Sequence, residues 1–140
     1  MEQIRIKYFT DIPPVKQVGD WVDLRSAQDI TLFPGDYRQI PLGIAVKLPN
    51  GYEAIIAPRS STFRNWGILS ANSIGIIDEA YCGPHDEWHF PVYATKQVTI
   101  RKGDRICQFR ILKHMEKLDI QTVEDLSGPD RGGFGSTGVR

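Results

Sequence analysis

The sequence predicts a single all-β domain, and three observations support that fold class. Its 140 residues suit one hydrophobic core and leave little room for a second. The 13 glycines and 9 prolines are spread along the chain and divide it into short segments, which favours strands over helices. Within these segments, apolar residues alternate with polar or small ones, which is the period-two pattern of a strand.

The first strands are predicted in the N-terminal half of the chain. Ile4, Ile6 and Tyr8 alternate with charged residues and indicate a strand at the N-terminus. Residues 40–48 are largely apolar and are followed by Asn50-Gly51, which is a strong hairpin turn sequence. Residues 52–57 are therefore expected to return as the partner strand of that apolar run.

One short helix interrupts the strands. Ser60 or Ser61 is a suitable N-cap for a helix from Thr62 to Trp66, and Gly67 is a suitable residue to end it. No other segment has a convincing helical pattern.

Three more strands are predicted after the helix, over residues 88–93, 98–100 and 105–112. In the last of these, alternation places Cys107, Phe109 and Ile111 on one face and Ile106 and Gln108 on the other.

The C-terminal residues have a different composition, which predicts a domain boundary. Residues 1–126 form the β-rich domain, and residues 127–140 contain five glycines and almost no core-forming side chains. Such a segment is too glycine-rich to hold one conformation alone. It is either a disordered tail or an arm that becomes ordered on a ligand.

Charge and hydropathy exclude several classes of partner. The 17 Lys and Arg residues balance the 17 Asp and Glu residues, and the isoelectric point is near 6.8. A general attraction to nucleic acid or to a membrane surface is therefore not expected, although a local basic site could bind a small anion. No apolar run approaches a membrane span, and the N-terminus lacks the apolar stretch of a signal peptide. We expect a cytoplasmic protein.

The expected cytoplasmic location predicts the oxidation state of the two cysteines. Cys82 and Cys107 are expected to be free thiols, because disulfides are rare in the cytosol. Neither lies in a CxxC spacing, and the three histidines show no HExxH pairing, so a zinc site is not expected.

Two segments in the middle of the chain carry residues suited to chemistry. Pro58-Arg59-Ser60-Ser61 offers a guanidinium and two hydroxyls to a phosphate, although a helix cap beside a surface arginine is the simpler interpretation. Asp78 lies near the turn of an expected hairpin over residues 72–83 and follows apolar residues. Partly shielded from water, it could act as a general base, whereas an Asx-turn is the simpler interpretation.

Two later segments add further candidates. Gln108 lies on a strand among apolar neighbours, where its amide needs a ligand phosphate or a backbone group as partner. An adjacent Asp104-Arg105 pair is more often structural than catalytic. In the glycine-rich residues 130–138, backbone N–H groups can approach phosphate oxygens closely, and Phe134 could cover a base. A solvated tail is the alternative there.

Together these segments resemble the five motifs of the trimeric dUTPase (deoxyuridine 5′-triphosphate nucleotidohydrolase) family. The resemblance covers residues 19–137, and it is most specific from Pro58 to Asp78. Gly-Asp-Arg-Ile-Cys-Gln at residues 103–108 and Gly-Phe-Gly-Ser-Thr-Gly at residues 133–138 complete the set. The pattern at residues 84–90 is similar to a subgroup found in Gram-positive bacteria and their phages.

The resemblance implies a fold, an activity and an assembly. The fold would be a distorted jelly-roll barrel with one short helix and a flexible C-terminal arm. The activity would be Mg²⁺-dependent hydrolysis of dUTP to dUMP and pyrophosphate, which limits uracil incorporation into DNA and supplies dUMP for dTMP synthesis. The assembly would be a homotrimer with shared active sites, each arm closing over a neighbour's site, without direct nucleic-acid or membrane binding.

It also implies roles for the residues that hold the phosphates. Asp78 would orient and deprotonate the water that attacks the α-phosphorus. Asp23 would help to hold Mg²⁺ through water, while the phosphates contact the metal directly. The phosphate chain would be bound by Arg59, Ser60 and Gln108, with Ser61 beside them.

The remaining roles concern the nucleoside and the arm. Uracil would be read mainly by main-chain groups in a pocket that includes Asn72, Gly75, Ile76 and Ile77, so that cytosine would leave buried groups unpaired. Tyr81 would pack under the deoxyribose. In the arm, Phe134 would stack on uracil, and the γ-phosphate would be bound by Arg131, Ser136 and Thr137, with Gly135 also among the substrate-binding residues.

The chain departs from the family pattern in three places. Asp20-Trp21-Val22 replaces the usual small residue and glycine before Asp23, and fewer residues than usual separate Arg131 from Phe134. The third departure is at residues 84–90, which replace the usual simple strand. In the subgroup with this pattern, an aromatic residue of the strand can take part in covering the base. Here Trp88 and Phe90 are interpreted as core residues, and His89, on the opposite face, is the better candidate for the site.

Two other functions are compatible with a similar scaffold. A dCTP deaminase shares the fold and a Pro-Arg-Ser-Ser-like motif, but it typically has Pro-Gly-Phe where this chain has Glu79-Ala80-Tyr81. A regulatory binding protein could use the same scaffold, since fold alone does not fix function. The presence of Asp78, Gln108 and Arg131 argues against a protein that only binds.

Overall fold

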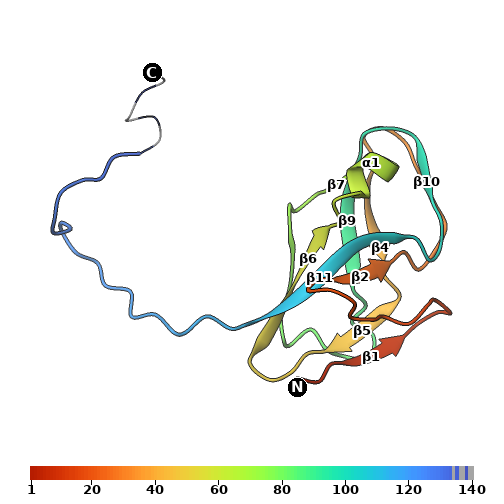
Figure 1. Ribbon diagram of the computed structural model, residues 1–140, viewed down its shortest axis with the longest axis horizontal. Helices are drawn as coiled ribbons and strands as arrows, with labels where there is room; N and C mark the ends of the chain where they lie inside the picture. The colour runs from red at the N-terminus through yellow and green to blue at the C-terminus, as the bar shows by residue number, and fades with distance from the viewer. Residues whose placement is uncertain (134, 136–137, 139–140) are drawn as a thin grey trace.

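The structure is a computed structural model that describes residues 1–133, 135 and 138. In this part of the chain, eleven strands and one helix form a β-rich body (Figure 1). The elements are β1 (Arg5–Tyr8), β2 (Val22–Arg25), β3 (Ile30–Leu32), β4 (Tyr37–Pro41), β5 (Ile44–Lys47), β6 (Tyr52–Pro58), α1 (Thr62–Trp66), β7 (Ile68–Ser70), β8 (Gly75–Ile77), β9 (His89–Ala94), β10 (Val98–Ile100) and β11 (Arg105–Lys113).

The strands pair antiparallel in four small sheets. The largest has the order β2-β11-β6-β8, and a second has the order β4-β9-β7. Two strand pairs, β1-β5 and β10-β3, complete the body. The neighbours in each sheet are mostly distant in sequence, so the fold depends on long-range pairing.

One hydrophobic core lies between these sheets. Trp88, Phe90 and Phe109 are its largest fully buried side chains, and Trp88 meets Phe109 edge to face with 5.3 Å between ring centroids. The cluster takes side chains from β2 to β11, which confirms one domain-wide core of the predicted all-β class.

The short helix forms where it was predicted, at Thr62–Trp66. Gly67 ends it with φ 62°, a left-handed conformation that glycine adopts without a Cβ penalty. The predicted side-chain cap is wrong, because Ser61 is the N-cap residue but makes no capping hydrogen bond. Instead, the buried Thr62 Oγ accepts from the Arg59 N–H at 2.8 Å and donates to the Ile106 carbonyl at 2.9 Å.

The predicted hairpin at Asn50-Gly51 is wrong. The chain does turn there, with Gly51 at φ 83°, but the flanking strands join different sheets. β5 pairs with β1, whereas β6 pairs with β11 and β8. The apolar run at residues 40–48 is also split, because Gly43, at φ 74°, separates β4 from β5.

Two further strand predictions need correction. β11 contains a register shift between Arg105 and Cys107, and Ile106, which was predicted on the face opposite Cys107, is buried as Cys107 is. Residues 72–83 do not form a hairpin, because β8 pairs with β6 and the chain then continues through turns from Asp78 to Cys82.

Beyond β11 the chain leaves the body. The His114 N–H donates to the Gly51 carbonyl at 2.8 Å, and the following residues run away from the sheets (Figure 1). Met115, Leu118 and Ile120 are exposed on this extension. Within the described part of the chain, no helix has the length and apolar character that a membrane crossing requires.

Candidate active site

Asp78 stands at the end of the edge strand β8. Its carboxylate Oδ1 accepts from the Ala80 N–H at 3.0 Å, and its carbonyl accepts from the Tyr81 N–H at 3.0 Å. The Asx-turn interpretation is therefore confirmed. The expected shielding from water is not found in the single chain, where Asp78 is exposed. The turn nevertheless holds the carboxylate in one place and leaves Oδ2 free of the turn bonds.

A cavity of about 360 Å³ opens beside this carboxylate. Five of the eight residues that line it were predicted from the sequence as site residues. They come from β8, from the following turn and from β9, and they are Ile76, Ile77, Asp78, Tyr81 and His89. The other three, Gln39, Glu87 and Pro91, were not predicted.

The backbone oxygen of Glu87 organises one wall of the cavity. It accepts from the Tyr81 hydroxyl at 2.9 Å and lies 3.0 Å from His89 Nδ1. Trp88 and Phe90 are buried in the core, whereas His89, on the opposite face of β9, lines the cavity. The interpretation of Trp88 and Phe90 as core residues is therefore confirmed, whereas the role of His89 in the site stays a prediction.

Gly75 fits closely against β6 at the start of β8. A Cβ built on Gly75 would lie 3.3 Å from the Cβ of Ile56, which is tighter than most real contacts. Asn72 lies in the preceding exposed turn, where Ser73 has φ 61°. Glycine at position 75 thus lets the strand that carries Asp78 pack directly on β6.

A second group of predicted residues lies at the other end of β6. Arg59 Nε lies 3.0 Å from Asp23 Oδ1, and Arg59 Nη1 donates to the Arg105 carbonyl at 3.1 Å. Gln108 is the register partner of Asp23, and its side-chain amide donates to the Pro58 carbonyl at 3.1 Å. We call Asp23, Arg59, Arg105 and Gln108 the arginine cluster.

Arg105 was not predicted as part of this group. Its Nη1 lies 3.3 Å from Asp23 Oδ2, so the expected pairing with Asp104 is wrong. Asp104 instead accepts from the Arg101 N–H at 2.9 Å within its own turn. Beside the cluster, Ser60 is exposed, and Ser61 makes no capping hydrogen bond.

The cavity and the arginine cluster lie far apart within one chain. Ile77 pairs with Ala54, and Arg59 follows Ala54 by five residues along β6. At about 3.3 Å per residue, roughly 16 Å of strand separates them. Asp78 lies beyond Ile77 in the direction away from Arg59, because β8 runs antiparallel to β6.

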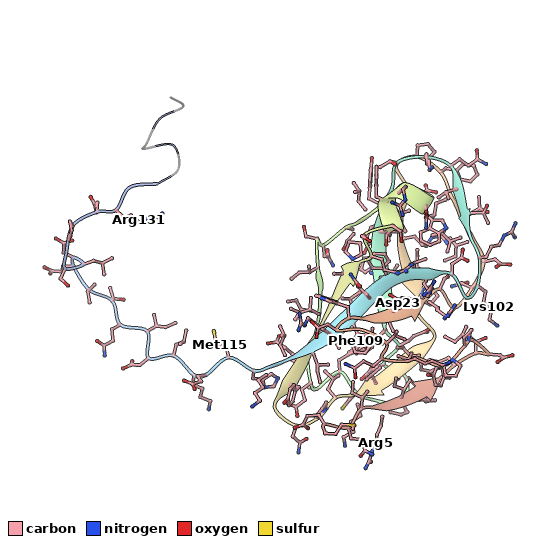
Figure 2. All side chains as sticks on the ribbon, in the orientation of Figure 1. Arg5, Asp23, Lys102, Phe109, Met115 and Arg131 are labelled. Carbon is pink, nitrogen blue, oxygen red and sulfur yellow. The ribbon has the colours of Figure 1, made fainter. Side chains whose placement is uncertain are left out.

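Of the predicted arm residues that the structure describes, Arg131 lies at neither place. Arg131 lies on the C-terminal extension, outside the body that carries Asp23 (Figure 2). Gly135 has φ 89°, a conformation that favours glycine. Phe134, Ser136 and Thr137 lie outside the described residues.

Cys107 lies behind the arginine cluster and does not take part in the site. Burial raises the pKa of its thiol well above 9.0, and the nearby Asp23 carboxylate raises it further, while Arg59 acts in the opposite sense. A neutral, buried thiol is a core side chain rather than a nucleophile.

Comparison with known proteins identifies the family. The dUTPase family model matches residues 10–138. The chain is 50% identical, over 99% of both chains, to a prophage-derived deoxyuridine 5′-triphosphate nucleotidohydrolase of Bacillus subtilis strain 168. The chain belongs to the dUTPase family.

Solved dUTPase structures support the fold. A variant of the dUTPase from Staphylococcus bacteriophage 80alpha, solved with dUpNHpp, matches with a TM-score of 0.78 and 19% identity, covering 99% of this chain and 100% of that one. A variant of the dUTPase from phage phi11 of S. aureus, solved to show the coordination of a structural Mg(II) ion, matches with a TM-score of 0.73 and 16% identity, over 88% and 97% of the two chains. The predicted all-β dUTPase fold is therefore confirmed.

Within this dUTPase fold, strand pairing explains two of the three unpredicted cavity residues. Gln39 on β4 is the register partner of Pro91 on β9, and this long-range pair forms part of the cavity wall. No local pattern in the sequence pointed to Gln39. Glu87 lies in the segment where the sequence departs from the family pattern, and that departure was the one available sign of its involvement.

Proposed function

We propose that the protein hydrolyses dUTP to dUMP and pyrophosphate, with Asp78 as the general base. The convergence of Asp78, Tyr81, His89, Ile76 and Ile77 on one cavity carries this proposal. A carboxylate fixed by a turn beside a cavity of nucleoside size is suited to orienting a water and accepting its proton. The water oxygen would join the α-phosphorus, and the bond to the bridging oxygen of the pyrophosphate would break.

The uracil ring of the substrate would be recognised by the backbone of β8. This strand is at the edge of its sheet, so one side of its backbone has no strand partner in the described structure. Successive N–H and C=O groups on that side match the acceptor and donor edge of uracil. Cytosine has the reverse pattern at its N3 and exocyclic positions and would leave buried groups unpaired.

The sugar would rest on Tyr81. The bond from its hydroxyl to the Glu87 carbonyl fixes the ring in the cavity wall next to His89. A ring held in this way is a flat apolar platform, and a 2′-hydroxyl against it would lose its water without gaining a partner. We therefore expect a preference for the deoxyribonucleotide over the ribonucleotide.

The phosphate chain would be bound by the arginine cluster together with Ser60 and Ser61. Arg59 directly follows β6, Gln108 lies on the neighbouring strand β11, and Ser61 makes no side-chain cap hydrogen bond. Arg59 is already partly neutralised by Asp23 at 3.0 Å. A triphosphate would therefore share Arg59 with Asp23, or it would displace the Asp23 carboxylate from Arg59.

Magnesium would be held mainly by phosphates and water. Within the described residues, no group of three or more His, Cys, Asp or Glu side chains could hold a metal ion. Both oxygens of Asp23 face arginines, which does not suit direct ligation, but each retains a lone pair for a metal-bound water. Asp23 thus fits a water-mediated role, in which the ion would offset phosphate charge.

The separation of the two groups of residues supports shared sites. The water on Asp78 must approach the α-phosphorus to about 3–3.5 Å, while Arg59 and Gln108 grip the same phosphate chain. The roughly 16 Å of β6 between them argues against one chain doing both. A neighbouring subunit of a homotrimer would bring its own arginine cluster to the cavity of the next.

The C-terminal segment would then close over this shared site as an arm. After Lys113 the chain contributes no strand to the body in the described residues, and it carries Arg131 and glycines suited to phosphate contacts. We place the domain boundary at residue 126 and assign residues 127–140 to the arm. Phe134, Ser136 and Thr137 would act from this arm.

Pyrophosphate release tests the proposal. With Mg²⁺, the wild-type protein is expected to release pyrophosphate from dUTP and not to release ammonia from dCTP. Asp78→Asn should lower kcat by about 10²–10⁴-fold. Asp11→Asn, at an exposed carboxylate outside the cavity, is the matched control and should keep the wild-type rate.

Heavy-oxygen water tests the position of attack. Hydrolysis in labelled water should place the label in dUMP, because the attack is on the α-phosphorus. Label in pyrophosphate would contradict this mechanism, and equal rates for wild type and Asp78→Asn would remove Asp78 as the base.

A further inference from the structure

A hydrogen bond in the cavity fixes which nitrogen of His89 carries the proton. Nδ1 of His89 lies 3.0 Å from the backbone oxygen of Glu87. A carbonyl oxygen only accepts hydrogen bonds, so Nδ1 must be the donor. In the neutral ring, Nε2 then carries a lone pair and can only accept. Within the described residues, no hydrogen bond engages Nε2.

The peptide that sets this tautomer is held rigidly. Trp88, fully buried, donates from its backbone to the Ile44 carbonyl at 2.8 Å and accepts from the Leu42 N–H at 2.9 Å. The Glu87 carboxylate accepts from the Gly43 N–H at 2.9 Å. The chain is thus fixed on both sides of the Glu87 carbonyl, and the orientation of the imidazole is set before any ligand arrives.

Two polar groups that share the cavity with His89 already have hydrogen-bond partners. The Tyr81 hydroxyl donates to the Glu87 carbonyl at 2.9 Å, and one N–H of the Gln39 amide donates to the Tyr37 hydroxyl at 3.0 Å. Asp78, as a carboxylate, offers only acceptors. Nε2 of His89 is thus an acceptor that lies in the same cavity as the Asp78 carboxylate, and a ligand group that binds to Nε2 must bring a donor.

The nucleoside of dUTP has only two such donors. They are the N3–H of uracil and the 3′-hydroxyl of the deoxyribose. One residue of an edge strand offers an N–H and a C=O on the same side, so the free edge of β8 can pair with N3–H and its neighbouring carbonyl. The 3′-hydroxyl is the donor that remains, and it belongs to the sugar that would rest on Tyr81, next to His89.

We propose that Nε2 of His89 accepts a hydrogen bond from the 3′-hydroxyl of the substrate deoxyribose. The inference rests on the proposed dUTP hydrolysis and assigns a substrate-binding contact within that site. It makes His89 a polar reader of the sugar and not an aromatic cover for the base. Glu87 is its positioning residue, since the Glu87 carbonyl sets the tautomer.

Nitrogen NMR of the labelled wild-type protein tests the tautomer directly. Long-range correlations between ring protons and ring nitrogens distinguish a protonated Nδ1 from a protonated Nε2. We expect the proton on Nδ1 in the neutral ring. A proton on Nε2 would overturn the proposal, and this result does not depend on enzymatic activity.

The KM values of two variants of His89, each measured with two nucleotides, test the contact between Nε2 and the 3′-hydroxyl. His89→Phe keeps an aromatic ring without an acceptor, whereas His89→Gln keeps an acceptor without the ring. For dUTP, His89→Phe should raise KM about three- to tenfold, the range of one neutral hydrogen bond, and His89→Gln, which keeps an acceptor, should raise it less than His89→Phe does. For 2′,3′-dideoxyuridine triphosphate, which lacks the 3′-hydroxyl, KM should be alike in all three proteins within about twofold.

The outcomes separate this inference from the proposed function. If wild type does not hydrolyse dUTP, the proposed function fails. If wild type is active but His89→Phe raises KM equally for both nucleotides, or His89→Gln is the more damaging variant, the sugar contact is refuted and stacking on the base is favoured. If His89→Phe does not fold, the KM values of His89→Gln and of wild type for the two nucleotides test the contact. A KM of His89→Gln for dUTP that is tenfold or more above that of wild type would refute it.

Discussion

Two inactive variants should restore activity when they are mixed, because the proposed site is divided between subunits. Asp78→Asn removes the general base, and Arg59→Ala removes the guanidinium of the arginine cluster. Alone, each is expected to keep less than about one hundredth of the wild-type rate. About 16 Å of β6 separates the two positions in one chain, so each variant leaves the other half of the site intact.

The size of the recovery follows from the shared geometry. Each site would take Asp78 from one subunit and Arg59 from another. After equal amounts of the two variants are unfolded in urea, mixed and refolded, about one quarter of the sites receive both intact residues. The mixture should therefore recover about one quarter of the wild-type rate, which is well above either variant alone.

Pyrophosphate release after refolding measures this recovery. The same procedure with wild type gives the reference, and Arg64→Ala, at an exposed arginine on α1, is the matched control for the loss of a surface guanidinium. A mixture no more active than the mean of its components would refute the argument from the separation along β6. Both residues would then have to act within one subunit.

Three further predictions concern side chains around the site. Thr62→Val should lower the free energy of unfolding in urea by about 2–3 kcal/mol, because the buried Ile106 carbonyl loses its donor, and Thr62→Ser should recover most of it. Gly75→Ala should raise KM for dUTP with little change in kcat, because the new Cβ would lie 3.3 Å from the Cβ of Ile56 and would displace β8. An unchanged KM would show that β6 moves instead of β8. The raised pKa of the Cys107 thiol means that the folded state holds this proton more tightly, so stability should fall as pH rises above 9.0, and Cys107→Ala should abolish that slope in urea melts at several pH values.

Local features of the fold were predictable because local rules determine them. The helix at Thr62–Trp66 is short and ends at a glycine whose φ of 62° other residues avoid. The burial of Trp88 and Phe90 follows from strand alternation in one element. In both cases the residues that decide the outcome are neighbours in sequence.

Strand pairing was less predictable because it depends on distant partners. Asn50-Gly51 does reverse the chain, but a turn sequence does not determine which strands pair. Ile44, Ala45 and Val46 are all buried, so β5 needs cover on both faces, and its edge is satisfied by β1 from the start of the chain. The bulge in β11 likewise departs from simple alternation, and Ile106 and Cys107 are both buried.

The same distinction applies to the site. The motifs contain Ile76, Ile77, Asp78 and Tyr81 of the cavity and all four residues of the arginine cluster, because each motif is a short local sequence. Their distribution in space depends on sheet topology: β8 and Arg59 are placed at different ends of β6 by the register of Ala54 with Ile77. Gln39 enters the cavity only through the pairing of β4 with β9, and no motif contains it.

Asp78 shows how a structural and a functional role can be combined in one carboxylate. The bond from the Ala80 N–H to Oδ1 fixes the side chain, and Oδ2 stays available for a water. Fixing the base in advance lowers the reorganisation needed during reaction. The exposure of Asp78 in the single chain is consistent with this role, because in the proposed site the arginine cluster of a neighbour and the arm would exclude bulk water only when substrate is bound. The turn supplies the position of the base, and the assembly supplies its environment.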